Sequence, residues 1–479
     1  MNFQFINNES TNKPGSRKAI RSHVMKGKNT GRIIQGRGRR HAVPLQSDFF
    51  RDVHLAERNE DIVDADGSTL IFPEITLIDT AHTLNNPFAG EEYTYFSFPV
   101  QFTSSMRYFV YEFNTSICNV IYPYAFCRPT EEIGSPWFKF MVADPACLHC
   151  LLAMAVTYLN IMSKSERPVE SLEATRHFTQ TLRLLNPRLS LPSAAKEDAN
   201  IAIIISLAIH SNLTQDLHAS AMHLDALQRL LDLRPGGISG IRECNRALVH
   251  KICRTDVELA VAQGTKPRFS DAGLTAVAAG PISARRLAYP LNQTSQLLQR
   301  VTRELLALCR RPGRTKMAAL QYQDVLISMW QRLVEFAPLG GTRPRDLLDD
   351  AWQLALLAFL VTVKWSTSYL RALHCKLLHK LLREHVESRA LVARGVEYRS
   401  LWLWTVFVYA LSLPDDERRG TLGEIRGMAR ELGISGWGDL KTLFKPFPWI
   451  GIVHDITGQS LWELAIDDDS IERPCDSEP

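Results

Sequence analysis

The first 117 residues contain no cysteine, and the nine cysteines that follow are irregularly spaced. A zinc-organised DNA-binding head needs four nitrogen or sulfur ligands for one ion, or six cysteines shared by two ions. Residues 1–117 therefore cannot form such a head. Cys147 and Cys150 make the single CxxC pair, but they lie in an apolar helical pattern without a second pair. We interpret them as thiols in or near the core, reduced as in an intracellular compartment, and we predict no metal and no cofactor.

The sequence also lacks the short motifs that organise common active sites. It has no GxSxG nucleophile elbow, no HExxH zinc motif, no GxxxxGK[ST] phosphate loop and no GxGxxG dinucleotide loop. We therefore predict that the protein is not an enzyme. Long apolar runs are missing too, since the run Leu401–Leu413 is too short to span a bilayer and the N-terminus lacks the apolar segment of a secretory signal. We expect a soluble intracellular chain with no membrane partner.

Two groups of candidate metal ligands are incomplete. Asp349 and Asp350 supply the first two carboxylates of a DDxxD pattern, which binds magnesium in all-α terpene cyclases, but the third carboxylate is missing. His374, His379 and His385 follow one another at spacings of five and six, which do not place them on one helical face. We expect these histidines on a polar or interfacial surface rather than around a metal ion.

The segment Gln263–Gly273 is rich in glycine, proline and polar residues, which is typical of a connection or a mobile surface loop. Two carboxylates, Asp256 and Glu258, come shortly before it. For both we favour helix capping or pairing with Lys266 or Arg268 over a ligand site.

Acidic residues are absent from Ser10–Ser47, which holds ten of the 55 lysines and arginines, so the rest of the chain carries a net negative formal charge. The basic segment is a candidate nuclear-import signal, a nucleic-acid arm or a solubilising tail. Its Arg37–Arg39 stretch is similar to the core of a minor-groove AT-hook, although Arg40 replaces the proline of that motif. The candidate arm residues are Arg17, Lys18, Arg21, Lys26, Lys28, Arg32, Arg37, Arg39 and Arg40.

Composition and periodicity divide the chain into four parts. We predict a disordered basic arm at 1–66, a mixed or irregular lead-in with short strands or irregular packing at 67–128, a helical body at 129–466 and an acidic disordered tail at 467–479. The fold class is all-α, an irregular multi-helix body without the fixed period of a solenoid.

Local signals place several helices of the body. Asp144 can cap a helix whose first residue is Pro145. A second helix ends at Pro235 and the two glycines after it. The predicted core stripes of these helices are Leu148, Leu151, Leu152, Ala155 and Leu159 in the first, and Leu224, Leu227 and Leu231 in the second. Further helices are predicted within Asp324–Phe336, Asp346–Trp365, Tyr369–Val386 and the aromatic run Leu401–Leu413.

Several stretches together resemble a known family. FQFIN and RKAIRSHVMKGKN are followed in order by DPACLHCLLAMAVTYLN, HFTQTLRLLNPRLS, HLDALQRLLDLRPGGISGI and KICRTDVELAVAQGTKPRF, and later by LWLWTVFVYALSL and WGDLKTLFKPFPWIGIVHDITGQSLW. This series is similar to fungal-specific transcription-factor-like proteins that carry the second family of fungal transcription-factor helical domains. Members often have a zinc binuclear cluster, which residues 1–117 lack. The resemblance implies a helical regulatory domain, a nuclear location and a role in transcription.

Two functions remain open at this point. The first is a nuclear transcriptional regulator or cofactor whose helical domain binds transcription-related proteins or an effector, with electrostatic DNA contact by the arm. The second is an all-α enzyme or small-molecule-binding protein with a pocket among the aromatic helices, lined by Trp402, Trp404, Phe407 and Tyr409. The sequence carries no signal for an oligomeric state.

Overall fold

The computed structural model describes residues 93, 95–114, 121–123, 126–127, 135–162, 171–270, 273–274, 287–310, 316–364 and 375–467. By its internal contacts the chain divides into two units, Met1–Glu74 and Ile75–Pro479, and every described residue belongs to the second. The predicted arm at 1–66 lies outside the described residues. So does the predicted acidic tail, apart from Asp467 at the end of the last helix.

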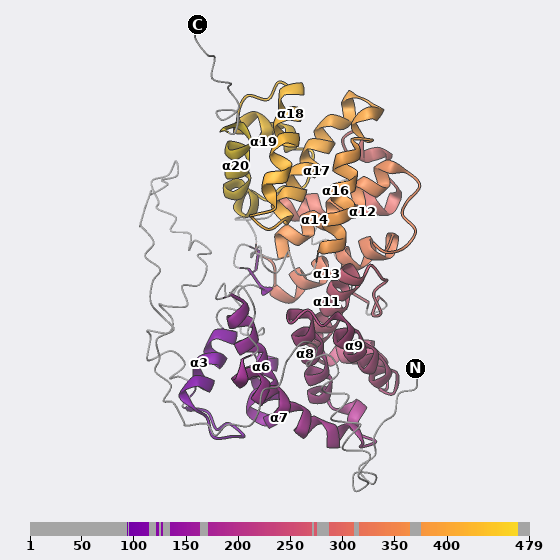
Figure 1. Ribbon diagram of the computed structural model, residues 1–479. Coiled ribbons are helices and arrows are strands. Elements are labelled where there is room, and N and C mark those ends of the chain that lie inside the picture. The colour runs from indigo at the N-terminus through magenta and orange to yellow at the C-terminus, as the bar shows by residue number, and fades with distance from the viewer. Residues whose placement is uncertain are drawn as a thin grey trace, which may run out of the picture. The chain divides into compact units, whose positions relative to one another are not determined.

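The described residues confirm the all-α prediction, because they contain helices and no strand (Figure 1). The α-helices are α3 (Ser104–Glu112), α5 (Ser135–Ala143), α6 (Pro145–Met162), α7 (Leu172–Leu189), α8 (Asp198–Leu213), α9 (Leu217–Asp232), α10 (Gly237–Cys244), α11 (Arg246–Gln263), α12 (Gln296–Cys309), α13 (Ala319–Phe336), α14 (Leu347–Lys364), α16 (Lys376–Ser388), α17 (Arg399–Ser412), α18 (Leu422–Glu431), α19 (Trp437–Phe444) and α20 (Gly451–Asp467). Short 3-10 turns are η4 (Ala194–Lys196), η5 (Leu291–Gln293), η6 (Val392–Arg394), η7 (Val396–Tyr398) and η8 (Arg418–Thr421). None of the described helices is long and apolar enough to cross a membrane.

Helix α6 begins as the sequence predicts. Pro145 occupies its first position, and Asp144 Oδ1 accepts hydrogen bonds from the backbone amides of Ala146 at 2.8 Å and Cys147 at 3.4 Å. The carboxylate also pairs with Arg188 of α7, which packs beside α6 (Figure 1). This cap satisfies amides that have no partner inside the helix. Both predicted stripes, in α6 and in α9, are buried.

Helix α9 ends just before Pro235, as predicted, but the chain after it was not predicted. The helix ends at Asp232, but the glycines lead directly into another helix, α10, that the sequence did not indicate. Gly236 adopts φ +76° as the N-cap residue of α10, a left-handed conformation that glycine adopts without strain. Proline and glycine here mark a change of direction between two helices rather than the end of helical structure.

The lead-in contains helix as well as irregular chain. Residues 95–103 have no strand, and Phe98 stacks on Phe102 with ring centroids 3.8 Å apart. Thr103 then caps α3 by accepting a hydrogen bond from the amide of Met106. The expected irregular packing is therefore present in the described part, and the alternative of short strands is wrong there.

Helix α11 belongs to two hydrophobic clusters. Leu248, Val249 and Ile252 pack with α6, α8, α9 and α10, whereas Val257 and Val261, one or two turns further on, pack with α12, α13 and α14. All five side chains are almost fully buried. The two clusters therefore share one helix, which has apolar residues on more than one face.

Candidate functional site

The nine arm cations lie outside the described residues, from Arg17 to Arg40. Their role in import or nucleic-acid contact stays a prediction. The described residues do include the aromatic helices and several clusters of polar side chains.

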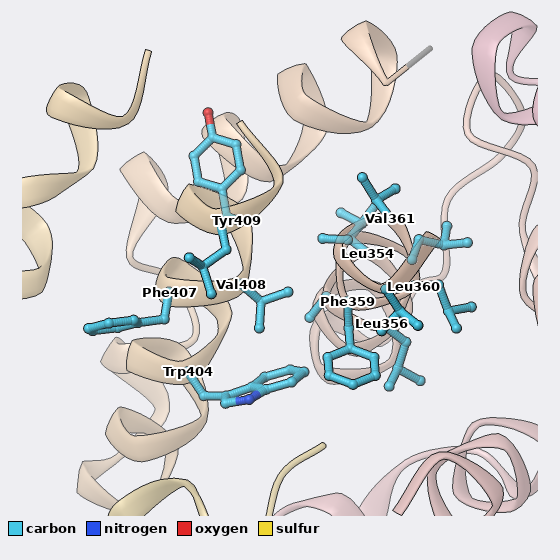
Figure 2. Packing of buried hydrophobic residues seen from close by; sticks show 14 of the residues in the cluster. Leu354, Leu356, Phe359, Leu360, Val361, Trp404, Phe407, Val408 and Tyr409 are labelled. Atoms are coloured by element: carbon cyan, nitrogen blue, oxygen red, sulfur yellow. The ribbon is translucent and has the colours of Figure 1, made fainter. Parts of the chain in front are cut away.

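The aromatic residues proposed as pocket lining form part of a packed core. Trp402, Trp404, Phe407 and Tyr409 of α17 are each 3 % exposed or less. Figure 2 shows Trp404 directed toward Phe359 of α14, with ring centroids 6.3 Å apart. Trp404 Nε1 also donates to the carbonyl of Pro448 at 3.1 Å. These side chains contact protein on their faces and edges, as expected for core packing rather than a ligand pocket.

We expected His374, His379 and His385 on a polar or interfacial surface. This prediction is wrong for His379 and His385, the two that the structure describes. His379 and His385 are 5 % and 7 % exposed, and His374 lies outside the described residues. Both flank the buried stripe of α16 that includes Leu378 and Leu382. Burial lowers the pKa of His385, which favours its neutral form. An amphipathic helix can thus carry histidines on its core-facing side when leucines surround them.

Both carboxylates of the partial DDxxD pattern contact other protein groups. Asp349 Oδ1 accepts from the amide of Ser295 at 2.8 Å, and Asp350 pairs with Arg343 at 2.7 Å. Across the described ranges no group of three or more histidine, cysteine or acidic side chains is arranged to hold a metal ion. Both carboxylates therefore join elements of the fold.

Asp256 fastens the loop after α11 to the helix. Its Oδ2 accepts from the backbone amides of Arg268 at 2.5 Å and Phe269 at 2.9 Å, and its Oδ1 lies 3.5 Å from the Arg268 guanidinium. The predicted pairing with Arg268 is confirmed. Of the two alternatives expected for this segment, Gly264–Ser270 fits a connection, and the burial of Phe269 is contrary to a mobile surface loop. Burial raises the pKa of Asp256 to about 6, while these hydrogen bonds act in the opposite direction.

Glu258 has different partners from those predicted. It pairs with Lys364 of α14 and, at 3.9 Å, with Arg254 one turn earlier in α11. The Lys364 ammonium lies 5.1 Å from the centre of the Trp330 ring, and burial lowers the pKa of this lysine to about 8. The contact links α11 to α14, which are far apart in sequence.

The CxxC thiols are buried, as expected. Cys147 Sγ faces the carbonyl of Ala199 at 3.8 Å and Cys150 Sγ faces that of Ile203 at 4.0 Å, both on α8. Burial raises the pKa of Cys147 strongly and that of Cys150 to about 11. Both groups are therefore thiols near neutral pH, in which form they are weak metal ligands and weak nucleophiles.

A small cavity of about 20 Å³ lies beside these thiols. Its polar lining includes Lys251 of α11, whose Nζ donates to Ser206 Oγ of α8 at 2.7 Å. The space is sufficient for about one water molecule. The sequence did not indicate this site, because its lining residues come from α5, α6, α8, α11 and Phe113 at the end of α3.

A second cluster missed from the sequence joins α11 to α13. The Nε2 of fully buried His250 lies 2.5 Å from Asp324 Oδ1, and Arg246 pairs with the same carboxylate. Burial, followed by the nearby arginines, lowers the pKa of His250 to about 3, so the neutral ring donates to Asp324. No hydrogen-bond partner for its Nδ1 is found among the described residues. The group joins α11 to α13 through buried polar contacts.

Two histidines meet between α6 and α7. His149 Nδ1 and His177 Nδ1 are 2.9 Å apart, and their ring centroids are separated by 5.1 Å. One ring must donate and the other accept, so at least one of them is neutral. Burial lowers both pKa values, and the neighbouring His177 lowers that of His149 further.

This pair predicts a loss of stability in mild acid. The unfolded chain binds protons below about pH 6.5, where the folded pair resists protonation, so the free energy of unfolding should fall as the pH drops below that value. Urea unfolding at about pH 7.5 and about pH 5.5 measures the difference. The double variant His149→Gln, His177→Gln should show a smaller difference in the free energy of unfolding between the two pH values. His218→Gln, at an exposed position, should leave that difference unchanged. An unchanged pH dependence in the double variant would count against the pair.

Residues 107–273 match the family model of the fungal-specific transcription factor domain. The match runs from within α3 through α11 and the loop that Asp256 holds, and it confirms the resemblance noted in the sequence. No curated protein and no solved structure matches the chain significantly. The matched domain indicates a transcriptional regulator.

Proposed function

We propose that this protein is a nuclear, non-enzymatic regulator of transcription whose helical domain binds other transcription proteins. The single observation that carries the proposal is the match of residues 107–273 to the fungal-specific transcription factor domain. The packing of the aromatic residues of α17 into the core supports it over a ligand pocket in that place. The basic arm would supply nuclear import and sequence-independent contact with DNA phosphates.

Localisation tests the role of the arm in import. A fluorescent fusion of the full chain should accumulate in nuclei, and deletion of residues 13–41 should abolish that accumulation because the clustered cations are lost. A variant in which the nine arm cations become glutamine keeps the length of the arm and should behave like the deletion. A fusion that is equally cytoplasmic with and without the arm would contradict the proposal.

DNA contact by the arm can be measured separately. Binding of the purified chain to random duplex DNA should weaken steeply with salt, with a slope in log–log form of about −0.9 for each phosphate neutralised. The nine-glutamine variant should lose this binding. If neither chain binds at modest salt, the arm does not contact DNA, and import is left as its role.

A further inference from the structure

The last helix, α20, has apolar residues on both its buried and its exposed side. His454, Gly458, Leu461, Trp462 and Ala465 form the face that packs inward. Gly458 lies so close to Trp437 and Trp449 that a Cβ atom there would meet them at 2.8 to 3.0 Å. The helix is therefore seated tightly, and its opposite face has a fixed orientation.

The opposite face exposes large aliphatic side chains. Ile452, Ile456 and Leu464 are 50 %, 82 % and 60 % exposed, respectively. Their spacings of four and eight residues place them along one side of the helix. We call Ile452, Ile456 and Leu464 the outer stripe. Single exposed apolar residues are ordinary, but an aligned series on one well-packed helix indicates a surface that binds another apolar surface.

The charges at the two ends of α20 differ in sign. Lys445, exposed, lies shortly before the helix begins, and Lys441 nearby pairs with Asp455 at 2.6 Å. Glu463, also exposed, lies in the last turns and accepts a hydrogen bond from Gln459. At the C-terminal end Arg426 Nε also donates to the carbonyl of Ala465 at 2.7 Å, so the charge complementarity rests on Lys445 and Glu463. When two such helices run antiparallel, Lys445 of each lies beside Glu463 of the other, and their macrodipoles also oppose favourably.

We propose that the outer stripe of α20 is the contact surface between two copies of this chain. A twofold axis near Ile456 would bring the two stripes together and place Lys445 of each copy near Glu463 of the other, an arrangement that is self-complementary. The helix has 17 residues, so the contact is about 25 Å long. Because a standard interface buries about 800 Å² on each partner, one helix face of this length should give a weak dimer with a dissociation constant in the micromolar range.

Sedimentation velocity of the full chain across protein concentration provides the test. The wild-type chain should shift from monomer to dimer, and Ile456→Asp should raise the dissociation constant about tenfold or more, because a buried stripe cannot accept a carboxylate. Leu172→Asp, at a position that is 66 % exposed on α7, is the matched control and should dimerise like the wild type.

Variants that reverse the charges of Lys445 and Glu463 test the same contact, even if Ile456→Asp folds poorly. Lys445→Glu and Glu463→Lys should each weaken the dimer, whereas the chain carrying both reversals should recover it. A wild-type chain that remains monomeric, or a dimer that none of the α20 variants weakens, would overturn the proposal. The measurement involves neither DNA nor nuclei, so its outcome is independent of the proposed regulatory function.

Discussion

Replacing Asp256 by alanine should lower the free energy of unfolding by about 3–5 kcal/mol. The substitution removes the acceptor for two backbone amides and the buried partner of Arg268. Both amides lie in the loop that carries buried Phe269, so their loss of partners is not readily compensated by water. The loop should detach from α11 before the rest of the domain unfolds.

Asp225 supplies a matched control, because it contacts the same guanidinium from α9. Its carboxylate lies 2.7 Å from Arg268 Nε, but its side chain is 52 % exposed. Asp225→Ala should therefore lower the stability by no more than about 1 kcal/mol. Urea unfolding followed by circular dichroism measures both variants. Equal effects of the two substitutions would show that burial of Asp256 does not govern its contribution.

Trp404→Ala should be comparably destabilising, by about 3–5 kcal/mol, because it opens a large cavity in the core. The indole packs against Trp352 at 5.0 Å and Phe447 at 5.6 Å between ring centroids, in addition to Phe359 (Figure 2). Its loss also leaves the carbonyl of Pro448 without the indole donor.

Thermal and urea unfolding should distinguish this effect from that of Tyr289→Ala, which removes an aromatic ring that is 51 % exposed and should have little influence. Trp404→Phe keeps most of the apolar volume and should lie between the two. A small change in Trp404→Ala, similar to that in the tyrosine variant, would mean that the aromatic helices are loosely packed and would revive a pocket there.

The elements that could be predicted from the sequence are those set by neighbouring residues. The cap at Asp144, the stripe of α9 and the buried aromatic run of α17 depend on spacings within one helix. Helix α10 could not be predicted, because Gly236 and Gly237 are equally compatible with the end of one helix and with the start of the next. The polarity of histidine favours a surface position for His379, but the leucines around it in α16 bury it.

The polar sites depended on long-range contacts and so could not be read from spacing. Lys251 and Ser206 are 45 residues apart, and His250 and Asp324 are 74 apart. The partner of Glu258 proved to be Lys364, on a helix distant in sequence, rather than the nearby Lys266. The partner of Asp256 is Arg268, twelve residues further on in the adjacent loop, and this pairing could be predicted from the sequence.

Because α11 packs in two hydrophobic clusters, the chain cannot be cut after this helix without exposing part of the core. The segment similar to the fungal-specific transcription factor domain ends at Gly273, but Val257 and Val261 of α11 are buried by helices that come after it. A fragment ending there would expose these valines to water and would lose the salt bridge from Glu258 to Lys364. The segment that matches the family model therefore ends inside a larger unit of packed helices, and we expect it to fold only together with the helices that follow it.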